Sequence, residues 1–168
     1  MKPLKHPDNL HLRGAQGWLE LGDHQEALRE LTKIRPAFHR HPDVLEVRWL
    51  VFARAHEWRR CVDIANSLIM AVPGRVSGWL HLSYALHELK LTQDAYENLS
   101  GVAKNFPHEM VIRYNLACYC CQLGRRTESL DWLRQAMSMG DAKQVMAMAV
   151  DDPDLATLVE EIRKLKKR

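Results

Sequence analysis

The chain has 168 residues, the size of one ordinary domain or of a short repeat array. Hydrophobic residues make up 46% of it and charged residues 27%, which is typical of a globular protein and argues against a disordered one. The 24 basic and 21 acidic side chains leave a net charge of +3, so the charge balance does not indicate nucleic-acid binding.

The cysteines and the apolar runs bear on the compartment. Residues 1–8 hold no apolar core of signal-peptide length, and no run of about 18 apolar residues occurs anywhere in the sequence. Three of the four cysteines, Cys118, Cys120 and Cys121, are too crowded for a framework of long-loop disulfides. We therefore expect a cytoplasmic protein that does not cross a membrane.

The apolar pattern predicts eight helices in chain order. They are expected at about 8–20, 24–37, 43–55, 58–71, 75–88, 92–105, 109–122 and 126–139. Pro42, Pro73 and Pro107 fall between successive pairs, where a helix must stop. Gly22 and Gly124 mark tight turns inside the first and fourth pairs.

A fixed period connects the pairs. Small residues recur every 34 positions, at Ala27, Cys61, Ala95 and Ser129. Four positions after each comes a core residue, and three positions later another. The first set is Leu31, Ala65, Leu99 and Leu133, and the second is Ile34, Leu68, Val102 and Ala136. A period of this length with two helical patterns per unit is typical of stacked helix pairs.

These residues resemble the tetratricopeptide repeat (TPR) family, whose pattern is Trp, Leu-Gly, Tyr, then Ala, Phe and Pro. The third unit matches best, with Trp79, Leu82-Ser83, Leu86, Ala95, Leu99 and Pro107. The fourth has Leu116-Ala117, Cys120, Gly124, Ser129 and Leu133, and the first has Ala15, Trp18, Gly22-Asp23, Ala27 and Leu31. The second has Leu45, Phe52, Cys61 and Pro73. The departures are Gly14 at the usual leucine, Arg113 at the usual tryptophan, and Arg48-Trp49 in place of the Leu-Gly pair.

The resemblance covers about residues 8–141 and implies an all-α protein, an α-solenoid of about four helix pairs wound as a right-handed superhelix. We expect a single repeat domain over residues 1–168, with repeats at 8–41, 42–75, 76–109 and 110–140 and a C-terminal cap at 141–168. Asp152-Pro153 is a typical helix start. The stripe Leu155, Leu158, Val159, Ile162 and Leu165 predicts one capping helix that closes the open end of the array.

The sequence carries no phosphate-binding glycine loop, no Gly-x-Ser-x-Gly elbow and no His-Glu-x-x-His motif, so we expect neither an enzyme nor a cofactor. In proteins similar to this one, the first helix of each pair lines a concave groove. The resemblance places Leu12, Gln16, Glu46, Leu50, Leu80, Tyr84, Tyr114 and Cys118 there, with His87 and Cys121 one turn further. An apolar groove with two tyrosines suits a hydrophobic or helical peptide segment. The leading hypothesis is therefore a protein-interaction module, an adaptor or chaperone.

Three alternatives remain open. A chaperone of the type III secretion kind combines a short repeat array with cytoplasmic residence, although that group is typically acidic. Cys118, Cys121 and His87 could share a soft metal or do thiol chemistry, but Cys120 stands at a core position and a structural zinc site needs four ligands. The basic tail, residues 163–168, could dock on an acidic partner or a phosphate backbone, or be a solvated helix end.

Overall fold

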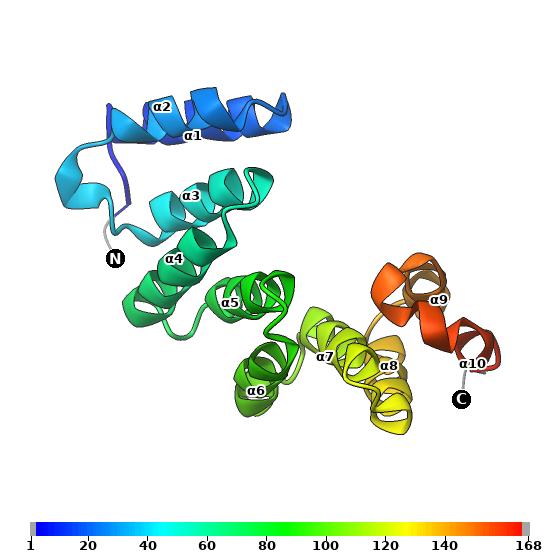
Figure 1. The fold of residues 1–168 in the computed structure, drawn as a ribbon. Coiled ribbons are helices and arrows are strands. Elements are labelled where there is room, and N and C mark those ends of the chain that lie inside the picture. The colour runs from blue at the N-terminus through cyan, green and yellow to red at the C-terminus, as the bar shows by residue number, and fades with distance from the viewer. Residues whose placement is uncertain (1–2, 166–168) are drawn as a thin grey trace. The chain divides into compact units, whose positions relative to one another are not determined.

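The computed structural model describes residues 3–165, and every regular element among them is a helix. The chain divides into two compact units, residues 1–85 and residues 86–168. Figure 1 shows their helices, and each unit is described by itself.

Unit 1 contains two helix pairs and most of a fifth helix. The helices are α1 (Asp8–Glu20), α2 (His24–Thr32), α3 (Pro42–Arg54), α4 (Trp58–Ala71) and α5 (Val76–Glu88), whose last three residues belong to unit 2. A 3₁₀ turn, η1 (Pro36–Phe38), follows α2. Helices α1 and α2 pack against each other, as do α3 and α4 (Figure 1).

Unit 2 contains α6 (Thr92–Val102), η2 (Ala103–Asn105), α7 (Met110–Gln122) and α8 (Arg126–Met139). Three short elements follow: α9 (Ala142–Asp151), η3 (Pro153–Leu158) and α10 (Val159–Arg163). The most extensive packing between two elements of this unit joins α7 to α8 (Figure 1). The 3₁₀ helix η3 also packs against α7.

The eight predicted helices are confirmed, with two shortened ends. Helix α2 ends at Thr32 and a 3₁₀ turn begins at Pro36, because the residue before a proline is pushed out of the helical region. Helix α6 ends at Val102 and continues as η2. After Gly140 the single predicted helix is wrong: α9 precedes it, and the segment from Pro153 is a 3₁₀ helix followed by a five-residue α-helix. Asp152 caps that segment as predicted, accepting from Asp154 N at 2.9 Å.

The 34-residue period is repeated in the backbone itself. The residue that turns the chain between the two helices of each pair has a positive φ: 84° at Gly22, 56° at His56, 66° at Lys90 and 75° at Gly124. Only two of the four are glycine, the residue that adopts this conformation without steric cost. The period therefore fixes the geometry of the turn even where the residue type does not indicate it.

The small residues of the period lie where the two helices of a pair touch. Ser129 Oγ donates to the carbonyl of Ala117 at 2.7 Å, and Cys61 Sγ donates to the carbonyl of Trp49 at 3.8 Å. These two bonds occupy equivalent places in the α7–α8 and α3–α4 pairs. Both donors are buried, so a larger side chain there would separate the helices.

Departures from the TPR pattern are accommodated locally. The bulky Trp49, 6% exposed, packs in one cluster with Ala65, which stands where the other pairs have leucine. Arg113, at the usual tryptophan, donates to the carbonyls of Ala103 and Phe106 and so ties α7 to the end of η2. Trp79 holds the equivalent loop with a bond from Nε1 to the Pro73 carbonyl at 3.0 Å.

Candidate functional site

The predicted groove residues of unit 1 lie on α1, α3 and α5. Glu46 and Leu50 are four residues apart on α3, and Leu80 and Tyr84 are four apart on α5, so each pair shares one side of its helix. We call these four residues the α3–α5 face. Leu50 and Tyr84 are both 43% exposed. The α1 residues differ, because Leu12 is buried in the core whereas Gln16 is exposed.

Stacked aromatic rings form the floor of the α3–α5 face. The rings of Trp49 and His81 lie parallel, with centroids 3.9 Å apart and an interplanar angle of 6°. Tyr84 meets Trp49 edge-on at 6.2 Å and Trp58 at 5.8 Å. Rings held in this way lose little conformational freedom on binding a ligand.

Glu46 of α3 connects this helix to α5 through hydrogen bonds. Its carboxylate accepts from His81 Nε2 at 2.7 Å and from the hydroxyl of Ser77, and Arg75 lies 3.6 Å away. Burial opposes ionisation of Glu46, yet the hydrogen bonds from His81 and Ser77 lower its pKa. The carboxylate is therefore ionised and gives this face one polar end.

The predicted groove residues of unit 2 are covered. Tyr114, Cys118, Cys121 and His87 are only 5–8% exposed, whereas the sequence predicted an open face. The physical reason is that η3, which belongs to residues 152–163, here called the closing segment, packs on this side of α7. Leu155, Leu158 and Ile162 of the closing segment are completely buried.

Polar contacts join the closing segment to these four side chains. We call the four side chains and Gln122 the α7 face, although His87 lies at the end of α5 and only the others lie on α7. Tyr114 donates its hydroxyl to Asp152 Oδ2 at 2.8 Å, and Cys118 Sγ lies 3.7 Å from the same oxygen. His87 Nε2 lies 3.1 Å from Asp154 Oδ2, and this bond lowers the pKa of Asp154. Two further contacts are Gln122 Nε2 to the Asp154 carbonyl at 2.8 Å and Cys121 Sγ to Thr157 Oγ1 at 3.2 Å.

The geometry does not support a metal site or a reactive thiol at Cys118, Cys121 and His87. Burial and the charges of Asp152 and Asp154 raise the pKa of Cys118 far above the ordinary range, so its sulfur stays a neutral thiol. Metal binding and nucleophilic attack both need the thiolate. Within residues 3–165, no three His, Cys, Asp or Glu side chains are grouped so that they could hold a metal.

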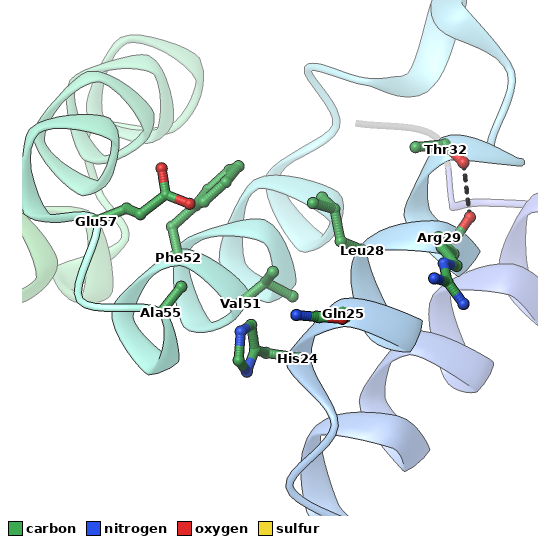
Figure 2. Close-up of a pocket in the computed structure, with 9 residues that line it drawn as sticks. All are labelled: His24, Gln25, Leu28, Arg29, Thr32, Val51, Phe52, Ala55 and Glu57. Atoms are coloured by element: carbon green, nitrogen blue, oxygen red, sulfur yellow. Dashed lines mark hydrogen bonds between the residues drawn. The ribbon is translucent and has the colours of Figure 1, made fainter.

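A cavity of about 370 Å³ that the sequence did not predict opens in unit 1 between α2 and the end of α3 (Figure 2). Its lining residues are His24, Gln25, Leu28, Arg29, Thr32, Val51, Phe52, Ala55 and Glu57. Leu28, Val51 and Phe52 give it an apolar side, and the remaining rim is mostly polar or charged. No sequence motif marks it, because its walls come from two different helix pairs.

The basic tail lies partly outside the described residues, since Lys166, Lys167 and Arg168 are not among them. Arg163 is paired with Glu160 at 2.9 Å on α10, an ion pair between neighbouring turns. Among residues 3–165, no helix is both long and apolar enough to span a membrane.

No protein-family model and no curated protein matches the chain. The chain is similar in structure to MamA 41-end from Desulfovibrio magneticus RS-1, with a TM-score of 0.73 and 18% identity over 96% of this chain and 94% of that one. It is also similar to a MamA RS-1 ArsTM double mutant, with a TM-score of 0.71 and 13% identity over 83% and 79% of the two chains. MamA is a TPR-like helical protein. The chain therefore has the fold of an all-helical, TPR-like α-solenoid.

Proposed function

We propose that this protein is a non-enzymatic interaction module, an adaptor or chaperone, and that its α3–α5 face binds a hydrophobic or helical segment of a partner protein. The observation that carries the proposal is that Leu50 and Tyr84 are each 43% exposed, with Tyr84 packed edge-on against Trp49 and Trp58. Anchors of this kind, fixed on rigid helices, supply most of the binding energy at protein interfaces.

The chemistry of the face supports a peptide rather than a small polar ligand. Leu50 and Tyr84 offer apolar contact, and Glu46 and Ser77 lie at its polar end. An amphipathic helix presents apolar anchors at i, i+3, i+4 and i+7, with polar residues beside them, and so complements such a surface. The TPR-like fold is consistent with this role, since stacked helix pairs use such surfaces to hold partners.

We also propose that the protein is cytoplasmic. All four cysteines are free and buried, which suits a reducing environment such as the cytoplasm.

Site-specific photocrosslinking tests the proposed face. A photoreactive residue replacing Leu50 should capture a discrete partner in cells, and Tyr84→Ala in the same chain should remove the product. Met70 on α4, 84% exposed, is the matched control position. The same products from positions 50 and 70, or capture at 50 that is indifferent to Tyr84→Ala, would rule out the α3–α5 face.

A further inference from the structure

The α7 face presents hydrogen-bond donors, and acceptors of the closing segment occupy them. Tyr114 and Cys118 both point their donors at Asp152 Oδ2. His87 Nε2 bonds to Asp154 Oδ2, and Gln122 Nε2 donates to the carbonyl of Asp154. Four donors from two helices thus converge on two aspartates that are two residues apart. Three of these donors reach carboxylate oxygens, whereas Gln122 reaches a main-chain carbonyl that any residue would supply. Both carboxylate oxygens of Asp152 accept, Oδ2 from Tyr114 and Cys118 and Oδ1 from Asp154 N, so an asparagine there, with one acceptor oxygen, would leave a donor unpaired.

The closing segment also shows which backbone suits the face. Asp152 has an extended backbone, φ −80° and ψ 120°, and its Oδ1 accepts from Asp154 N at 2.9 Å. This turn directs the Asp152 carboxylate to α7 and the Asp154 carboxylate to His87 at the end of α5. Leu155 and Leu158 follow and are completely buried. The occupant is therefore recognised as Asp-x-Asp-Leu-x-x-Leu, with carboxylates for orientation and leucines for buried area.

The conformation of the closing segment depends on its docking. η3 is a six-residue 3₁₀ helix, longer than the three or four residues at which such helices usually end. Helix α10 has five residues, far below the length at which an isolated helix is stable in water. Asp154 keeps 35% of its side chain exposed, so solvent reaches this end of the contact.

We propose that the α7 face is a second protein-binding site, which accepts an Asp-x-Asp-Leu segment of a partner protein in exchange for the closing segment. The proposal is independent of the α3–α5 face, because it concerns other residues and a partner of acidic rather than apolar character. The closing segment lowers the apparent affinity of the partner by the fraction of molecules in which it is undocked. The closing segment is tethered beside the α7 face, so it competes at an effective concentration on the order of millimolar. Weakening its contacts should therefore strengthen the binding of a segment from a separate molecule.

A labelled synthetic peptide with the sequence of residues 150–163 provides the probe, and fluorescence anisotropy with the full chain gives its dissociation constant. The full chain carrying Asp152→Asn and Asp154→Asn should bind the peptide at least about tenfold more tightly than the unmodified chain, because its own segment competes less well. The control peptide carries the same two asparagines and should bind this variant at least about tenfold more weakly than the acidic peptide, since it lacks both carboxylates.

A reversible lock tests the exchange without weakening the fold. Thr157 Oγ1 lies 3.2 Å from Cys121 Sγ, so Thr157→Cys places a second sulfur beside Cys121. Under oxidising conditions the closing segment is then tied down and peptide binding should fall at least about tenfold, with recovery on reduction. The same chain with Cys121→Ser cannot form the lock and should show no redox dependence.

Equal binding of the acidic and asparagine peptides overturns the proposal. So does peptide binding that is the same in the locked and reduced forms. If the asparagine variant forms a concentration-dependent dimer and binds no peptide, the occupant is a second copy of this chain, and the proposed partner is again excluded.

Discussion

His81 lies flat on Trp49, with ring centroids 3.9 Å apart, and the same imidazole hydrogen-bonds Glu46 on the helix that carries Trp49. One side chain of α5 thus makes both an apolar and a polar contact with α3. The pair explains how a tryptophan is tolerated where the TPR pattern has a small residue. The large ring packs in one buried cluster with the small Ala65, and Tyr84 of the α3–α5 face meets it edge-on.

Trp49→Ala should destabilise the protein by about 3–5 kcal/mol, because it leaves a large cavity among buried side chains. Adding Ala65→Leu should restore part of this loss, since leucine occupies that place in the other three pairs. Urea unfolding of the two single variants and the double variant gives the coupling energy. Strictly additive effects would show that the two positions do not share one space.

Gly78→Ala should destabilise the protein by about 1–3 kcal/mol through overpacking. A Cβ at this position would lie 2.9 Å from Ile69 Cγ1 and 3.3 Å from the backbone nitrogen of Ile69, so α5 would have to move away from α4. Gly101→Ala is the matched control, because a Cβ there meets nothing within 4 Å. That control should gain up to about 1 kcal/mol from helix propensity. Thermal melts in which both variants gain stability would contradict the close approach.

Spacing made the helices predictable, but it could not show contacts between distant segments. The apolar pattern and the 34-residue period placed α1 to α8, and Gly22 and Gly124 were predicted as turns. The equivalent turns at His56 and Lys90 were not predicted, since these residues give no local signal for a positive φ. The early end of α2 was foreseeable from Pro36. The burial of Tyr114 was not, since it depends on Asp152, which is 38 residues away and outside the repeat pattern.

The ion pair between Asp8 and Arg35 predicts a defined loss of stability in acid. Asp8 is completely buried and accepts from Arg35 N and Nε, both at 2.8 Å, and these bonds lower its pKa. A lowered folded-state pKa contributes stability that is complete above the unfolded value of about 4 and is lost as the pH falls through the folded value. Asp8→Asn should therefore lower the melting temperature at pH 7, and the difference from the unmodified chain should shrink below about pH 4.

Melting curves between pH 7 and pH 2.5 check this prediction. Asp131→Asn is the control, because Asp131 is 60% exposed and pairs with Arg134 only at the surface. It should change the melting temperature little at any pH. A difference for Asp8→Asn that is constant across the whole range would mean that Asp8 does not titrate through its bond with Arg35.

Loosening the closing segment should expose the thiols of the α7 face. Leu155→Ala with Leu158→Ala removes two completely buried side chains, so Cys118 and Cys121 should react with a maleimide much faster than in the unmodified chain. Mass spectrometry assigns the labelled cysteines, and Cys61 of unit 1, which is also buried, reports on general unfolding. Labelling of Cys61 at the same rate would mean that the closing segment does not open separately.

Ending the chain after Gly140 should have a stronger effect and cause aggregation.

Binding to the α3–α5 face should persist at high salt. Its proposed contacts are the apolar Leu50 and the amphipathic Tyr84, and apolar burial is not screened by ions. Leu50→Ala with Tyr84→Ala should weaken a partner captured at this face by about 2–4 kcal/mol, that is, at least about thirtyfold. The matched control, Met70→Ala, removes an equally apolar side chain that is 84% exposed on α4 and should leave affinity unchanged. Affinity measured at about 0.1 M and 1 M salt distinguishes binding by apolar contact from binding by charge. A partner that dissociates at the higher salt and is indifferent to both substitutions would be held by charge, and the α3–α5 face would not be its site.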